Sequence, residues 1–283
     1  MKIHPDAVEG QVRVEDSDVT YYDTGTPGDG RTPVVLIHGT GGSATSHFRI
    51  LYPMLAARHR VLAINFSHLE NLTRELRIED LAAQVIAVLE DRAADTGAHL
   101  VGYSLGAAVS ATIAADRPEL VNTLTLIAGW AKTDQQQALR NSIWHRLFHG
   151  DRDALREFTT FEAYGHPFLG SLSETEVAAL VAARSFPPGI EEQMKLNRNI
   201  NILDKIGGIC APTLIVGCTY DHMVPIKHSR LLFGAIPDAR LAEVPSGHAA
   251  PMERPAQLFQ LIDGFVVSPQ AVRPGTTLAS ISV

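Results

Sequence analysis

The stretch "HLVGYSLGAAVSA" (residues 99–111) decides the fold. A short apolar run leads into Gly102-Tyr103-Ser104-Leu105-Gly106, and an alanine-rich stretch of helical character follows. A serine between two glycines, where a strand becomes a helix, is typical of a tight turn that holds the hydroxyl above the edge of a sheet. Crowding by neighbouring backbone explains the glycines. The first amides of the helix favour negative charge at the same place.

Around this stretch, runs of strand character alternate with helical runs. "VRVEDSDVTYYDTG" (12–25) predicts two antiparallel strands, and "PVVLIH" (33–38) has the continuous apolar character of a buried parallel strand. Further strands are expected at 60–66, 99–104, 120–129, 211–218 and 239–245, and helices at 47–59, 78–94, 105–118, 227–236 and 253–266. This alternation predicts an α/β fold with a mainly parallel twisted sheet and helices on both faces.

The alternation breaks between the strand at 120–129 and the strand at 211–218. The intervening residues show helical patterns without a clear strand, so we expect a helical cap inserted over the sheet. The predicted organisation is a core made of 1–130 and 206–266, a cap at 131–205, and a flexible tail at 267–283. The tail assignment depends on its richness in Pro, Ser and Thr.

A serine hydroxyl needs a positioned base, and two loops offer the partners. His248 follows the last predicted strand of the core, and Asp221 follows the strand before it. Loops after the carboxyl ends of parallel strands share one edge of the sheet, the edge at which Ser104 stands. We therefore expect a catalytic triad in the chain order Ser104, Asp221, His248, with His248 as the base and Asp221 orienting it.

An attack by Ser104 creates an oxyanion that needs amide donors. The amide of Leu105 is one candidate, and the amide of Thr40, in the glycine-rich loop after "PVVLIH", is the second. The same loop could be interpreted as a phosphate cradle. It lacks both common phosphate-binding patterns, so no nucleotide cofactor is expected.

These motifs together resemble the α/β-hydrolase family of the type with a serine nucleophile and a helical cap. The resemblance rests on "LIHGTGG" (36–42), "GYSLG" (102–106), "PTLIVGCTYDHMVP" (212–225) and "PSGHAAPMERP" (245–255), in the expected order. It implies the same triad and oxyanion loop on these positions. One departure is Asn65-Phe66-Ser67, where relatives commonly carry an aspartate and a glycine-rich turn; this implies a reshaped loop beside the pocket.

A serine rather than an aspartate at position 104 speaks against dehalogenase and epoxide hydrolase chemistry. The expected function is a serine hydrolase acting on an ester, lactone or thioester of a small to medium apolar substrate. Carbon–carbon bond hydrolysis, a lyase or a cyclase on the same triad, and a non-catalytic binding protein remain alternatives. Aromatic side chains predicted to contact the substrate are Tyr103, Trp130, Trp144, Phe148 and Phe161.

Composition excludes other classes. The chain carries 31 acidic and 24 basic residues, with a net charge of −7 and no basic block, so nucleic acid is not an expected partner. No signal peptide or membrane span is visible, so a cytoplasmic protein without a membrane partner is predicted. His145 and His149 stand at metal-ligand spacing, but no third ligand is evident and no metal is expected. Whether the chain is a monomer or a homodimer stays open.

Overall fold

A computed structural model describes residues 3–279 and shows a nine-stranded sheet in the order β1-β2-β4-β3-β5-β6-β7-β8-β9. The first two strands form an antiparallel hairpin, β2 pairs antiparallel with β4, and all other neighbours are parallel. The predicted fold class is therefore confirmed. The strands are β1 (Val8–Val14), β2 (Ser17–Asp23), β3 (Val34–Ile37), β4 (Val61–Ile64), β5 (Ala98–Tyr103), β6 (Val121–Ile127), β7 (Thr213–Cys218), β8 (Ala239–Val244) and β9 (Thr276–Leu278).

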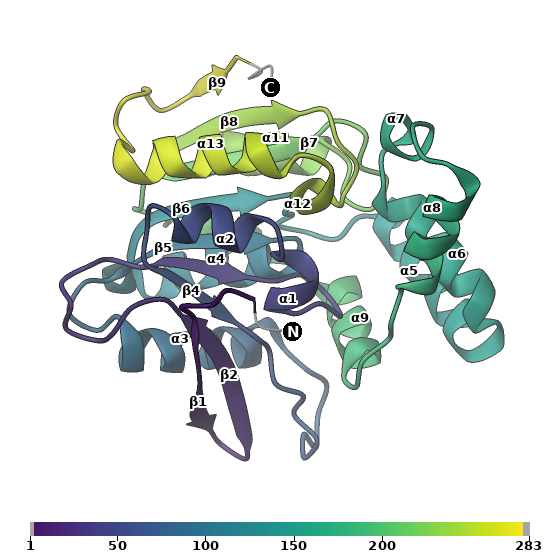
Figure 1. Cartoon of the computed structure of the whole chain (residues 1–283), viewed down its shortest axis with the longest axis horizontal. Coiled ribbons are helices and arrows are strands. Elements are labelled where there is room, and N and C mark those ends of the chain that lie inside the picture. Colours follow the sequence, from purple (N-terminus) through teal and green to yellow (C-terminus); the bar gives the residue numbers. More distant parts are fainter. Residues whose placement is uncertain (1–2, 280–283) are drawn as a thin grey trace.

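Helices cover both faces of the sheet (Figure 1). One apolar layer packs under α3 (Ile78–Arg92), α4 (Leu105–Asp116) and α11 (Lys227–Ala235). The other packs under α1 (Ala44–His47), α2 (Leu51–Ala56), α12 (Ala250–Glu253) and α13 (Pro255–Val267). Every residue of β3 and β4 is buried, which explains why these strands are apolar without alternation.

The segment between β6 and β7 folds into a series of helices. They are α5 (Gln135–Gly150), α6 (Arg152–Ala163), α7 (His166–Leu169), α8 (Glu174–Ala182), α9 (Ile190–Asn199) and α10 (Leu203–Ile206). In Figure 1, α5 to α8 lie together beside the end of the sheet, and α9 lies nearer to the core. The boundaries of a separate cap domain stay a prediction. Among residues 3–279, no helix is both long and apolar enough to cross a membrane.

The predicted flexible tail is wrong for residues 276–278. These residues form β9, which extends the sheet beyond β8. Arg240 holds the preceding segment, because its guanidinium donates to the carbonyl of Val272 at 2.8 Å and to Gln270 Oε1 at 3.1 Å. A strand of three residues is too short to show a period of its own. The last part of the predicted tail, 280–283, lies outside the described residues.

A buried ion pair joins the hairpin to the parallel part of the sheet. Asp23, at the end of β2, is fully buried and accepts hydrogen bonds from Arg60 Nη2 at 2.7 Å and from Arg92 Nη2 at 3.0 Å. Arg60 immediately precedes β4, and Arg92 ends α3. One carboxylate therefore fixes three elements. Its removal leaves Arg92 without an acid among the described residues and leaves Arg60 only the more distant Asp29, at 3.6 Å.

We predict that Asp23→Ala lowers the free energy of unfolding by about 3–5 kcal/mol, the usual effect of breaking a buried charge pair. Asp18→Ala is the matched control, because Asp18 pairs with Arg13 at 3.1 Å while both side chains are about half exposed. The control should lose at most about 1 kcal/mol. Urea unfolding followed by circular dichroism measures both values. Equal losses in the two variants would contradict a special role for Asp23.

Candidate active site

Ser104 stands at the junction of β5 and α4 in a strained backbone conformation, with φ 56° and ψ −119°. A Cβ atom at Gly102 would overlap the carbonyl oxygen of Gly106, and one at Gly106 would overlap the carbonyl oxygen of Ile37. The two glycines are thus required by contact with backbone, as the sequence predicts. A non-glycine residue at positive φ persists only when surrounding structure enforces it, and such strain is typical of functional turns.

The structure brings Ser104, His248 and Asp221 into one hydrogen-bonded chain. Ser104 Oγ lies 2.8 Å from His248 Nε2, and His248 Nδ1 lies 2.7 Å from Asp221 Oδ2. An ionised carboxylate only accepts hydrogen bonds, so Nδ1 carries the proton and Nε2 faces the serine hydroxyl as an acceptor. All three residues are buried, with exposures of 6–7%. This is the geometry of a nucleophile, a base and an orienting acid.

Backbone amides fix Asp221 in place. Its Oδ1 accepts hydrogen bonds from the amides of Met223 and Val224, both at 2.8 Å, which leaves Oδ2 for the imidazole. Two other titratable residues near these strand ends, His222 and Glu243, take no part in this chain of hydrogen bonds. His222 is exposed and stacks on Phe161, while Glu243 pairs with Arg230.

The glycine-rich loop after β3 approaches the serine closely. A Cβ at Gly39 would lie 2.9 Å from the Cβ of Ser104. The amide of Gly39 donates to His47 Nδ1 at 3.1 Å, and that of Gly41 donates to Gln193 Oε1 at 2.8 Å. Between them, the amide of Thr40 has no acceptor among the described residues.

Leu105 is the first residue of α4, and its amide likewise has no acceptor within residues 3–279. A helix start leaves its first amides unpaired and carries partial positive charge. Thr40 and Leu105 therefore flank Ser104 with two amides that remain available for an external acceptor. Both predicted oxyanion donors are thus amides without an acceptor among the described residues.

A neutral histidine holds the glycine-rich loop. His38 Nδ1 donates to the carbonyl of Gly39 at 2.8 Å, and its Nε2 accepts from the amide of Phe66 at 3.1 Å. Burial lowers the pKa of His38 to about 4. The unusual loop after β4 takes part as well, because Asn65 Oδ1 accepts from the amide of Ala44 at 2.7 Å. An asparagine thus anchors the start of α1.

A cavity of about 390 Å³ opens above Ser104. Of the aromatic residues predicted to contact the substrate, Tyr103, Trp130 and Trp144 line it. Phe148 and Phe161 do not, and that expectation is wrong. Phe148 stacks behind Trp144 with ring centroids 4.6 Å apart, and Phe161 is 64% exposed on the outer side of α6.

The pocket is also more polar than the sequence analysis predicts. Polar residues that it missed include His47, Arg140, Arg184 and Asn197, all of which line the cavity. They come from four separate segments, α1, α5, the segment after α8, and α9. No local pattern links such distant positions, so the sequence held no signal for them.

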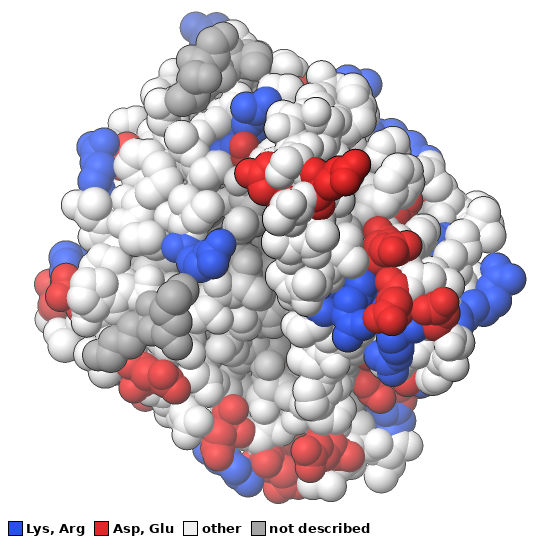
Figure 2. Space-filling model, turned by 45° about the vertical axis from the view of Figure 1, so that its right-hand side comes forward, with Lys and Arg blue, Asp and Glu red and all other residues white. Residues whose placement is uncertain are grey.

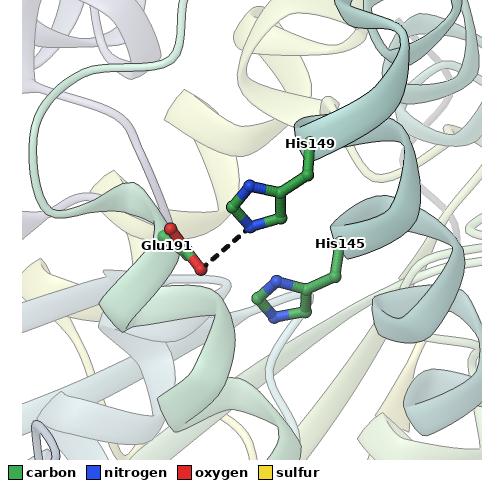
Figure 3. Close-up of side chains that lie close together, drawn as sticks. All are labelled: His145, His149 and Glu191. Carbon is green, nitrogen blue, oxygen red and sulfur yellow. Dashed lines mark hydrogen bonds and ion pairs between the residues drawn. The ribbon is translucent and has the colours of Figure 1, made fainter.

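His145 and His149 of α5 meet a third potential metal ligand, Glu191 of α9 (Figure 3). The three ligand atoms lie within 4.8 Å of one another, so the reason for dismissing this pair, the lack of a third ligand, is wrong. His149 Nε2 lies 3.2 Å from Glu191 Oε1, and Lys195 Nζ also lies 3.2 Å from that oxygen. The carboxylate already has a cationic partner, which a metal ion would have to displace.

Comparison with known proteins identifies the family. The family described as the alpha/beta hydrolase fold matches residues 32–255. The chain belongs to the α/β-hydrolase family. It is 30% identical over 269 residues to pyrrolizixenacetamide deacetylase of Xenorhabdus hominickii, covering 91% of this chain and 98% of that protein. It is 31% identical over 264 residues to RutD of Azorhizobium caulinodans, named for carbamate hydrolysis, covering 88% and 95%.

Solved structures agree on the fold. MGS-M2, an α/β-hydrolase enzyme from a deep-sea metagenome library of the Medee basin, superposes with a TM-score of 0.82 at 20% identity, covering 97% of this chain and 99% of that one. The predictions of an α/β-hydrolase fold and of an enzyme of the hydrolase type are thus confirmed at the level of the family.

The buried, neutral His38 generates a prediction about pH. Its pKa is about 4 in the folded protein against 6.5 for an ordinary histidine, so between these values the folded state binds fewer protons than the unfolded chain. The stability that this neutral group contributes is complete above about pH 6.5 and is lost as the pH falls toward 4. We expect the unfolding free energy of His38→Asn to depend less steeply on pH than that of the wild type. The difference between the two slopes corresponds to at most about one bound proton. Urea titrations between pH 7 and 4.5 measure this slope, and identical slopes would contradict the prediction.

Proposed function

We propose that this protein is a serine hydrolase that transfers the acyl group of a small to medium substrate to water through a Ser104 acyl-enzyme. The observation that carries the proposal is the unbroken hydrogen-bond chain from Ser104 through His248 to Asp221 at the floor of a cavity. Membership of the α/β-hydrolase family and relatives named as a deacetylase and for carbamate hydrolysis support it.

In the first half-reaction Ser104 Oγ attacks the acyl carbon while His248 Nε2 takes the hydroxyl proton. The carbonyl π bond opens and its electrons move to oxygen, where the amides of Leu105 and Thr40 stabilise the oxyanion. Collapse of the tetrahedral intermediate breaks the bond to the leaving group, which departs with the proton from His248. Asp221 holds the imidazole in the required tautomer and stabilises its charged form.

In the second half-reaction water takes the place of the leaving group. His248 removes a proton from water, hydroxide attacks the acyl-enzyme, and Ser104 regains its proton as the acid departs. The same pair of amides serves both oxyanions. The expected bond is an ester, lactone or thioester, and the named relatives extend the proposal to acyl–nitrogen bonds.

Other reactions on the same triad, namely carbon–carbon bond hydrolysis, lyase or cyclase chemistry, remain the alternative function. A lyase or cyclase is separated by the label, because hydrolysis incorporates oxygen from ¹⁸O-labelled water into the acid and a lyase or cyclase product carries none. Carbon–carbon bond hydrolysis also labels the acid, and its second product distinguishes it, since the leaving carbon gains a C–H bond and no alcohol, thiol or amine is released. A binding protein without catalysis would fail to react at Ser104 with a fluorophosphonate probe.

We predict that Ser104→Ala and His248→Ala each lower kcat by roughly 10⁴-fold or more, because each removes a group that changes its bonding in the transition state. Initial rates with 4-nitrophenyl esters from acetyl to dodecanoyl, a lactone, an acyl thioester and an anilide measure this loss. Circular dichroism shows that the variants are folded. Retention of wild-type activity in either variant would overturn the assignment.

Asp221→Asn should retain more activity than either of those variants, since it leaves the nucleophile and the base in place. The asparagine still accepts the two amide hydrogen bonds, but its amide group disturbs the imidazole tautomer. The measurement is kcat for the same esters. A silent substitution would show that Asp221 is not the group that orients His248.

A further inference from the structure

The cavity above Ser104 is cationic in a protein that is acidic overall. Three arginines line it, Arg49, Arg140 and Arg184, and no aspartate or glutamate is among its lining residues. The whole chain has seven more acidic than basic residues, and both signs are interspersed on the face in Figure 2. The composition of the cavity therefore departs from that of the molecule, and the departure favours an anionic ligand.

The arginines differ in their partners. Arg140 Nε donates to Glu162 Oε2 at 3.1 Å, so its charge is balanced within the protein. Within the described part of the chain, neither Arg49 nor Arg184 has a carboxylate within ion-pair distance. Arg49 is exposed to solvent, whereas Arg184 is half-buried. Arg184 is therefore the partly desolvated cation for which the protein supplies no counter-charge.

Arg184 is held in position, but one of its hydrogen-bond donors has no acceptor among residues 3–279. Its Nε donates to Thr160 Oγ1 at 3.2 Å, and its guanidinium lies 5.1 Å from the ring centroid of Tyr164. Its Nη2 is enclosed and has no hydrogen-bond acceptor. The hydroxyl of Thr159, the neighbour of Thr160, is likewise enclosed without a partner and lines the same cavity. Two unsatisfied donors on residues that line one cavity call for a missing acceptor.

The charge of Arg184 reaches the reaction centre. Burial lowers the pKa of His47, which holds the oxyanion loop, and the charge of Arg184 adds to the effect. Burial raises the pKa of Tyr164, and the charges of Arg184 and Arg49 oppose this rise. The carboxylate of Glu253 contributes to the raised pKa of Tyr164, and it is already engaged by the amides of Gly165 and Gly247.

Resting on the function proposed above, we propose that the natural substrate carries a carboxylate, which Arg184 binds with the help of the Thr159 hydroxyl. A planar guanidinium matches a carboxylate by two parallel hydrogen bonds, which a neutral substrate cannot make. Asn197, whose Nδ2 donates to Thr40 Oγ1 at 2.9 Å, also lines the cavity, and its Oδ1 is an acceptor without a partner that offers a place for a substrate donor. The selected substrate thus carries a carboxylate on its acyl or its leaving group, in contrast to the purely apolar one that the sequence predicts.

Two substrate pairs test the proposal on either side of the scissile bond. Mono-4-nitrophenyl adipate and 4-nitrophenyl hexanoate have six-carbon acyl chains that differ in a terminal carboxylate. In 4-carboxyphenyl and 4-carbamoylphenyl hexanoate, the carboxylate or its amide is on the leaving group. We expect the ratio of kcat/KM, anionic over neutral, to exceed one in at least one pair and to fall about ten- to hundred-fold in Arg184→Met.

Arg146→Gln is the matched control. Arg146 is exposed on α5 and lies outside the cavity, and its substitution removes the same charge from the same helical region. Its ratio should equal that of the wild type, and Arg184→Lys should recover part of the ratio lost in Arg184→Met. Ratios above one that survive in Arg184→Met, or ratios of one or less in both pairs, would overturn the proposal.

A binding measurement keeps the test independent of turnover. Adipate should raise the Tm of Ser104→Ala more than 1,6-hexanediol does at equal ionic strength, and Arg184→Met should abolish the difference. If no ester is hydrolysed and adipate still binds through Arg184, the hydrolase assignment fails while the anion site stands. If esters are hydrolysed but adipate has no Arg184-dependent effect and the ratios do not change, the anion site fails alone.

Discussion

The site depends on one close contact between backbones. The first turn of α4 packs against the end of β3 so tightly that no Cβ atom fits at Gly106, where the carbonyl of Ile37 lies. This contact forces the sharp turn at Ser104 and brings the glycine-rich loop within reach of the serine. The oxyanion amides and the nucleophile are therefore set by the same packing of glycine against backbone. A strained serine is retained because the sheet and the helix on either side enforce its conformation.

Two further strand ends complete the arrangement. Asp221 follows β7 and His248 follows β8, so the parallel sheet places both on the edge at which β5 ends. Hydrogen bonds to the amides of Met223 and Val224 then fix the carboxylate without a second charge. The imidazole needs no metal or distant residue to select its tautomer, since the carboxylate already determines which nitrogen carries the proton.

The sequence was sufficient for these parts because each is a local signal joined to a general rule. Apolar runs mark the parallel strands, and the rule that loops follow their carboxyl ends brings Ser104, Asp221 and His248 together. The helical insertion obeys no such rule. Trp144 and Phe148 lie one turn apart on the same face of α5, yet only Trp144 lines the cavity, because tertiary packing and not the helical pattern decides how far the cavity extends along that face. Glu191 reaches His149 across 42 positions for the same reason. The strand β9 was missed because three residues show no period.

The catalytic groups and the groups that recognise the substrate come from different parts of the fold. The groups that break and form bonds lie on loops of the sheet, whereas Arg140, Thr159 and Arg184, which give the cavity its polarity, belong to the helical segments between β6 and β7. A guanidinium in a half-buried wall loses hydration, and only a ligand or a protein carboxylate restores what it loses. Arg140 obtains this from Glu162, and Arg184 does not. Because Arg184 lines the cavity of the nucleophile and no carboxylate of the described residues pairs with it, we expect its counter-charge to come from the substrate.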